Sequence, residues 1–87
     1  MTEIDAISSL DKAMRNSYVL ITGGKTLKEL MQGDEIIFAH NVEKPIEIKD
    51  IEEVIKYFEE LEEYEKCSKL DFMKELIGAL YEIKNKL

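Results

Sequence analysis

The stretch that decides the fold runs from Asp50 to Leu76 and reads DIEEVIKYFEELEEYEKCSKLDFMKEL. In its first half, apolar residues recur three and four positions apart, which is the spacing of one face of an α-helix. Asp50 and Glu53 form a capping pair that predicts the start of this helix. The residues on the expected buried face are Ile51, Val54, Ile55, Phe58 and Leu61. The pattern therefore predicts a helix over about residues 51–61.

The second half of the stretch begins another helical pattern, which continues to the end of the sequence. Its apolar residues are Tyr64, Cys67, Leu70, Met73, Leu76, Ile77, Leu80, Ile83 and Leu87. Asp71 marks a candidate local break or cap. Gly78 costs roughly 1 kcal/mol in a helix interior, which favours the close approach of a neighbouring segment there. Together the two patterns predict a C-terminal helical hairpin.

Upstream of the hairpin, the N-terminal residues predict a further helix over about 3–15. Its expected buried stripe consists of Ile4, Ile7, Leu10 and Met14. Thr2 and Asp5 fit an N-cap followed by an acidic residue three positions later. Asn16 and Ser17 then predict the end of this helix.

Two short runs between the helices have the composition of β-strands. The first is Tyr18–Thr22, closed by a Gly23-Gly24 turn, and the second is Glu35–Ala39. The tight segment between them favours antiparallel neighbours over a full parallel crossover, which needs a dozen or more residues. The predicted fold class is α+β: a small antiparallel sheet of two or three short strands packed on the N-terminal helix and the C-terminal hairpin, in one domain spanning residues 1–87.

The segment between the two predicted strands has two readings. Thr26 with Glu29 predicts a short helix to Gln32, closed by Gly33, whereas residues 25–27 pairing back on the first strand would make a third strand. The short helix is favoured. A loop over residues 40–48 follows the second strand. The side chains expected to be buried in one core are Ile4, Ile7, Leu10, Leu20, Ile36, Phe38, Val54, Phe58, Leu70, Ile77 and Leu80.

Composition excludes several classes of protein. The 87 residues contain 45% hydrophobic residues, enough for a folded domain, and no apolar run near the roughly 18 residues that span a bilayer. Glu3 and Asp5 stand where a signal peptide carries basic residues, so a soluble, cytoplasmic protein is expected. Cys67 is the single cysteine, which excludes an internal disulfide and a cysteine-based zinc site.

The charge is concentrated in one segment. The formal net charge is −7, and residues 43–65 alone contain ten acidic and three basic residues, so this segment accounts for the whole of it. A net acidic chain disfavours direct binding to nucleic acid or to an anionic membrane, because both attract an excess of Lys and Arg. Two interpretations stay open: a solvated face that keeps the domain soluble, or a surface that docks on a basic partner.

Residues suited to catalysis or ligand binding are few. Thr22–Thr26 resembles part of a phosphate-binding loop, but Val19 stands where that loop needs its first glycine. His40 is the only histidine, so a two-histidine metal site cannot form, and we expect it at the surface or at a strand end. Cys67 is expected to pack as a small apolar side chain between helices. The sequence predicts no enzyme activity, no cofactor and no metal site.

Aromatic residues next to the acids indicate a surface that binds another protein. Tyr57 lies on the flank of the acidic helix and Tyr64 at the turn after it, and tyrosine supplies buried area at small entropic cost. The alternative is that both rings only cover the edge of the core. The candidate partner-binding residues are Glu52, Glu53, Tyr57, Glu59, Glu60, Glu62, Glu63 and Tyr64.

Residues Ile51–Leu76 resemble a helical hairpin of the UVR type, an interaction motif of bacterial excision-repair subunits and some protease adaptors. The resemblance centres on the ten residues Leu61–Leu70, LEEYEKCSKL. An aromatic residue followed by acids, two small residues, a base and a leucine is matched by Tyr64, Glu65, Cys67, Ser68, Lys69 and Leu70. The whole chain is also similar to small acidic accessory proteins of tailed bacteriophages. That resemblance implies a phage-encoded protein of host takeover or anti-defence, which inhibits or redirects a host protein.

The first functional hypothesis is a non-enzymatic inhibitor or regulator that docks its acidic helical face on a basic, nucleic-acid-handling protein. The alternative is an adaptor or assembly factor that pairs through the C-terminal helical hairpin, a homodimer included, with the acids serving solubility alone. A small enzyme remains conceivable only if His40 and Cys67 converge in the fold.

Overall fold

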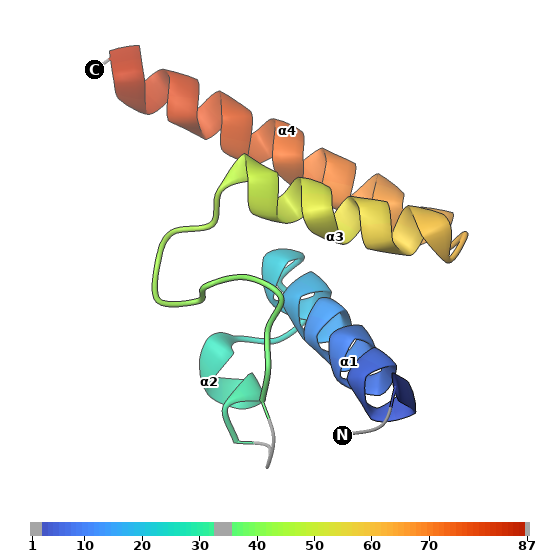
Figure 1. The fold of residues 1–87 in the computed structure, drawn as a ribbon. Coiled ribbons are helices and arrows are strands. Elements are labelled where there is room, and N and C mark those ends of the chain that lie inside the picture. Colours follow the sequence, from blue (N-terminus) through green and yellow to red (C-terminus); the bar gives the residue numbers. More distant parts are fainter. Residues whose placement is uncertain (1–2, 33–35, 87) are drawn as a thin grey trace. The chain divides into compact units, whose positions relative to one another are not determined.

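The structure of the chain is a computed structural model that describes residues 3–32 and 36–86, with side chains described from Ile7 onward. Its helices are α1 (Glu3–Ile21), α2 (Leu27–Leu30), α3 (Ile48–Glu60) and α4 (Tyr64–Lys86) (Figure 1). The described residues contain no β-strand, so the predicted α+β fold with its small antiparallel sheet is wrong and the class is all-α. No helix in the described parts of the chain is long and apolar enough to cross a membrane.

The chain divides into two units, Met1–Ile46 and Glu47–Leu87, which are described one at a time. The first unit contains α1, α2 and the segment that follows α2. The second unit is the hairpin of α3 and α4. The single-domain assignment stays a prediction.

Helix α1 is longer than the sequence predicts, because it runs through the residues assigned to the first strand. Asn16 and Ser17 do not end it, and Tyr18–Ile21 form its last turn. Ala13, Ser17 and Ile21 are buried and lie four residues apart, on one stripe of the helix. The β-branched composition of residues 18–22 is a weak preference, and the burial of this stripe outweighs it.

The Gly23-Gly24 pair ends α1 instead of turning a hairpin. Gly23 has φ +77°, and its N–H donates to the Leu20 carbonyl at 3.3 Å, while the Gly24 N–H donates to the Val19 carbonyl at 2.9 Å. These two bonds form a Schellman motif, in which glycine is favoured at the left-handed position. A Cβ on Gly24 would lie 3.3 Å from Cγ1 of Val19, so the second position is also crowded. The motif explains both glycines without a strand or a phosphate loop.

The short helix after this turn is confirmed, and it is α2. The Glu29 N–H donates to Oγ1 of Thr26 at 3.1 Å, and the Thr26 N–H donates to Oε1 of Glu29 at 3.3 Å, which is the predicted capping box. The helix ends at Leu30, and Met31 is its C-cap. Gly33, predicted to close it, lies outside the described residues.

The described residues assigned to the second strand form no regular secondary structure, and Glu35 lies outside the described residues. Side chains of α1 bind their backbone instead. Nδ2 of Asn16 donates to the Ile37 carbonyl at 3.0 Å, and the Ala39 N–H donates to Oγ of Ser17 at 2.8 Å. The polar groups that a sheet would have satisfied are thus partly satisfied by a helix.

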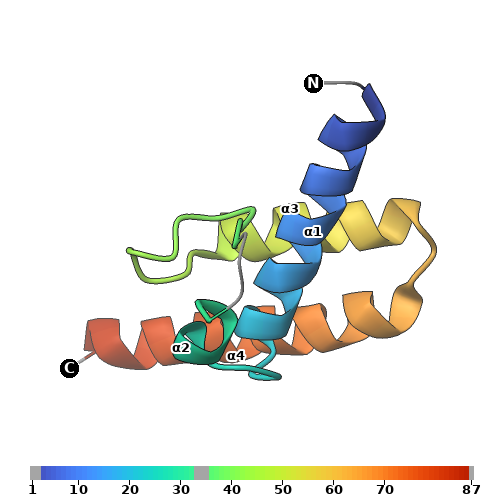
Figure 2. The ribbon, with the colours of Figure 1, turned by 90° about the horizontal axis from the view of Figure 1, so that it is seen from below.

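The predicted C-terminal hairpin is present as two antiparallel helices, α3 and α4, which lie side by side in both views (Figure 2). Helix α3 begins earlier than predicted, at Ile48, because its N-cap is Glu47. The Glu47 N–H donates to the Asp50 carboxylate at 3.0 Å, so Asp50 closes a cap instead of opening one with Glu53. Helix α4 continues through Asp71, which is not a break.

The predicted core is partly confirmed. Val54, Phe58 and Leu70 are fully buried, as is Ile51, and Cys67 is buried as expected. Ile7, Leu10 and Leu80 are exposed, so their predicted burial is wrong, and Leu20, Ile36, Phe38 and Ile77 are half-buried. The side chain of Ile4 lies outside those described. Helical spacing predicts a face correctly, yet it cannot say whether another element covers that face.

Candidate functional site: the hairpin tip

The turn that joins α3 to α4 repeats the Schellman motif of α1, but with a glutamate in place of glycine. The Glu62 N–H donates to the Glu59 carbonyl at 3.0 Å, and the Glu63 N–H donates to the Phe58 carbonyl at 2.9 Å. Glu62 has φ +59°, which makes it the only described non-glycine residue with a positive φ. A side chain in this left-handed region costs about 1–2 kcal/mol, so the turn is held by the two helices that it joins.

This turn presents apolar and acidic side chains together, and we name residues Glu59–Glu65 the hairpin tip. Leu61 is 47% exposed and Tyr64 is 61% exposed. The acids around them that are exposed are Glu59, Glu60, Glu62 and Glu65. No lysine or arginine occurs within residues 57–65, so the tip is locally anionic. Two apolar side chains bordered by charge are typical of a protein-binding surface.

Two of the predicted site residues have structural contacts that remove them from the exposed surface. Glu63 is half-buried and forms an ion pair with Lys66 at 3.0 Å, and the Lys66 ammonium lies 5.9 Å from the centre of the Phe58 ring. Tyr57 is half-buried, and the centre of its ring lies 5.2 Å from the centre of the Phe58 ring, in an edge-to-face arrangement. These contacts stabilise the turn. Tyr57 and Glu63 are therefore supports of the tip more than docking residues.

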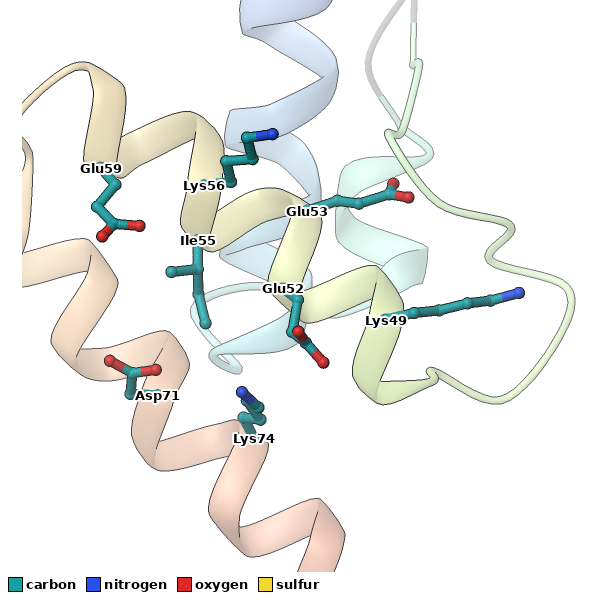
Figure 3. A pocket seen from close by; sticks show the side chains of 8 residues that line it. All are labelled: Lys49, Glu52, Glu53, Ile55, Lys56, Glu59, Asp71 and Lys74. Atoms are coloured by element: carbon teal, nitrogen blue, oxygen red, sulfur yellow. The ribbon is translucent and has the colours of Figure 1, made fainter.

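Glu52 and Glu53 lie nearer the start of α3, away from the tip, where a shallow groove follows the hairpin (Figure 3). The groove is lined by Lys49, Glu52, Glu53, Ile55, Lys56, Glu59, Asp71 and Lys74. Figure 3 shows Glu52, Ile55 and Glu59 directed toward α4. Glu53 and Lys56 point away from that helix in the same view. The predicted acidic residues thus occupy two places, the tip and the groove, with Glu59 at the junction.

Cys67 is hydrogen-bonded to a residue that lines the groove. Its Sγ donates to the Ile55 carbonyl at an S–O distance of 3.6 Å, and the side chain is buried. Burial raises the pKa of the Cys67 thiol above its ordinary value, and the charges of Glu59 and Asp71 raise it further. A protonated, buried thiol is a poor nucleophile, so Cys67 is a packing residue here.

The roles of two residues of this site were not predicted from the sequence. Leu61 continues the buried stripe of α3 by spacing, but it is the C-cap of the helix, and the chain turns away there. Asp71 lies on α4 and lines the same groove as Glu59 only because the two helices pair. The lack of glycine at the predicted helix-to-helix turn is the one signal that could have indicated an unusual turn at residues 61–63.

The residues considered for catalysis, His40 and Cys67, each form a structural contact. His40 is half-buried and its Nδ1 lies 2.8 Å from Oγ of Ser17, while Sγ of Cys67 donates to the Ile55 carbonyl. Among the described side chains, those of residues 7–32 and 36–86, no three His, Cys, Asp or Glu residues are arranged to hold a metal ion. Comparison of the sequence and structure with protein-family models, curated proteins and solved structures gives no match.

Proposed function

We propose that this chain is a non-enzymatic, cytoplasmic protein-binding module that docks the hairpin tip and the adjoining acidic face of α3 on a basic partner. The observation that carries the proposal is the exposure of Leu61 and Tyr64 amid four exposed glutamates. Exposed acids alone serve solubility well. Exposed acids around two large apolar side chains combine long-range attraction with a desolvated contact, and specific complexes use both.

The backbone at Glu62 supports this proposal independently. The Schellman turn would be more stable with glycine at the left-handed position, yet the residue there is an exposed glutamate. Backbone strain is common at binding surfaces, where the surrounding structure holds an unfavourable conformation. In this proposal the strain is the cost of placing one more carboxylate beside Leu61.

The chemistry of the tip suggests a class of partner. A surface that is anionic with an apolar centre is complementary to a basic groove, and proteins that handle nucleic acids have such grooves. Occupying that groove would make this chain an inhibitor or regulator of the partner. The resemblance of Ile51–Leu76 to a UVR-type hairpin and of the chain to phage accessory proteins agrees with a protein that acts by binding another protein.

The test compares two variants with the same change in net charge. Glu60→Lys reverses one charge at the tip, whereas Glu43→Lys reverses one exposed charge elsewhere. Partners captured from a host lysate by the unaltered chain are identified and purified, and their affinity for each variant is measured at low and high salt. We expect the tip variant to bind roughly tenfold or more weakly at low salt, with the control close to the parent.

The apolar part of the tip needs its own variants. Tyr64→Ala and Leu61→Ala are each expected to weaken binding at all salt concentrations, because their contribution is buried area and not charge. Circular dichroism checks that every variant keeps its helices. Equal affinities for the parent, the tip variant and Tyr64→Ala in folded proteins would refute docking through the tip.

A second candidate function, assembly through the hairpin, is favoured by a different observation. Four large apolar side chains on one face of α4 are exposed: Phe72, Leu76, Leu80 and Ile83. A contiguous exposed apolar stripe is a common feature of interaction surfaces, whereas scattered exposed residues are not informative.

A further inference from the structure

Helix α4 is much longer than the helix it pairs with. The first residue of α3 is Ile48, and its Cδ1 lies 3.9 Å from where a Cβ on Gly78 would be. Helix α4 continues from there to Lys86. At about 1.5 Å per residue, residues 79–86 extend roughly 12 Å past the end of α3. Both ribbon views show this extension within the hairpin unit (Figures 1 and 2).

The extension carries the apolar stripe of α4 into a region without α3. Phe72, Leu76, Leu80 and Ile83 are spaced four, four and three residues apart, and they are between 42% and 65% exposed. They lie on a different face of α4 from buried Cys67 and Leu70, which meet the rest of the hairpin. Helix α4 therefore has two apolar faces, and α3 covers one of them.

Charges beside the stripe indicate what covers the second face. Glu75 and Lys86 are both exposed and are eleven residues apart, close to three full helical turns, so they lie on the same edge of the stripe. Their midpoint in the sequence falls next to Leu80. A second copy that runs antiparallel, related by a two-fold axis between Leu80 and Tyr81, brings Glu75 of each copy beside Lys86 of the other.

The same arrangement aligns the apolar residues. Ile83 of one copy falls between Leu76 and Leu80 of the other, which is the knobs-into-holes geometry of paired helices. Glu82 then lies opposite the small residue Ala79. A parallel pair lacks this match, because Glu75 would face Met73 and Leu80 of the second copy.

We propose that two copies of this chain associate through residues 75–86 of α4, in an antiparallel pair with reciprocal Glu75–Lys86 ion pairs. This pairing rests on the second candidate function, assembly through the hairpin, and is independent of docking through the tip. The interface is small, so the dimer is expected to dissociate on dilution.

Sedimentation equilibrium of the whole chain over a range of concentrations tests the proposal. We expect a reversible monomer–dimer equilibrium, and Leu80→Glu should make the chain monomeric at every concentration measured. Glu75→Lys alone and Lys86→Glu alone should each weaken the dimer roughly tenfold or more, because each places like charges together. The double variant with both changes should recover most of the parental affinity, since it restores the opposite pairs. Lys84→Glu, an exposed change on the other edge, is the matched control and should leave the equilibrium nearly unchanged.

Two outcomes would overturn the proposal. A parent that stays monomeric at its highest soluble concentration would refute assembly through α4 altogether. A dimer that is lost in Leu80→Glu but is not restored in the double charge exchange would refute the antiparallel arrangement, and would leave assembly through the stripe standing.

Discussion

Oγ of Ser17 lies 2.8 Å from Nδ1 of His40, and it also accepts the Ala39 N–H at 2.8 Å. Ser17 is the only described polar residue that is fully buried. Its neighbour Asn16 donates to the Ile37 carbonyl, so two adjacent residues of α1 hold residues 37–40. A buried hydroxyl with two partners satisfies groups that would otherwise lose their hydrogen bonds to water.

This contact predicts that Ser17→Ala destabilises the chain by about 1–3 kcal/mol, because buried polar groups lose a partner. Ser8→Ala is the matched control: it lies on the same helix, is exposed, and gains the same helix propensity. Urea denaturation followed by circular dichroism measures both variants. Hydrogen exchange at the Ala39 amide should quicken in Ser17→Ala alone. Equal stability of the two variants would show that the contact contributes nothing.

The two Schellman turns predict that one substitution in each turn changes the free energy of unfolding, in opposite directions. Glu62→Gly should raise the free energy of unfolding by about 0.5–1 kcal/mol, because glycine adopts a positive φ without a steric cost. Gly23→Ala should lower it by about 1 kcal/mol or more for the same reason. Thermal and urea denaturation measure both. Glu53→Gly, in the interior of α3, controls for the flexibility of glycine and should be destabilising. A destabilised Glu62→Gly protein would contradict the strain inferred for the turn.

Leu70 and Leu80 lie on the same helix and differ in burial, since Leu70 is fully buried and Leu80 is 57% exposed. Leu70→Ala should cost about 2–5 kcal/mol, because it removes buried methyl groups and leaves a cavity. Leu80→Ala should change the stability of the monomer by less than about 1 kcal/mol. Denaturation at low protein concentration, where any dimer has dissociated, measures both. Similar costs for the two would mean that α4 packs differently.

The raised pKa of Cys67 predicts a loss of stability at alkaline pH. The unfolded thiol ionises near its ordinary pKa of 9.0, whereas the folded thiol stays protonated to higher pH. The resulting stabilisation is fully present below the unfolded pKa and is lost as pH rises through the folded one. The difference in unfolding free energy between the parent and Cys67→Ala should therefore shrink from about pH 7 to about pH 10. A pH-independent difference would indicate an accessible thiol, and rapid modification by a thiol reagent in the folded state would confirm that.

The helical hairpin could be predicted from the sequence because apolar residues recur three and four positions apart in both of its helices, most clearly in α3. Ile51, Val54 and Phe58 repeat at helical spacing between charged residues, so a helix is the local structure that buries all three on one face. The strand at residues 18–22 was mispredicted because local composition is a weak preference. Ser17 and Ile21 continue the stripe of α1 only if the helix runs on, and burying them outweighs the β propensity of Tyr18 and Val19.

The candidate site could likewise be predicted only in part from the sequence. The acidic segment and Tyr64 are visible in the sequence, because charge and residue type need no fold to be counted. The exposure of Leu61 and the support given by Glu63 and Tyr57 depend on where the chain turns.

By itself, the sequence determined the periodic helices of the hairpin, the capping box at Thr26, and the anionic segment that dominates the charge. Each of these depends on residues within a few positions of one another. Only the tertiary structure decided that Ser17 binds residues 39 and 40, that Glu62 takes a left-handed conformation, and that α4 extends past α3 with an uncovered apolar face. These features depend on contacts between distant residues. Local patterns indicate which faces are apolar, but the packing of whole helices decides which of those faces are covered.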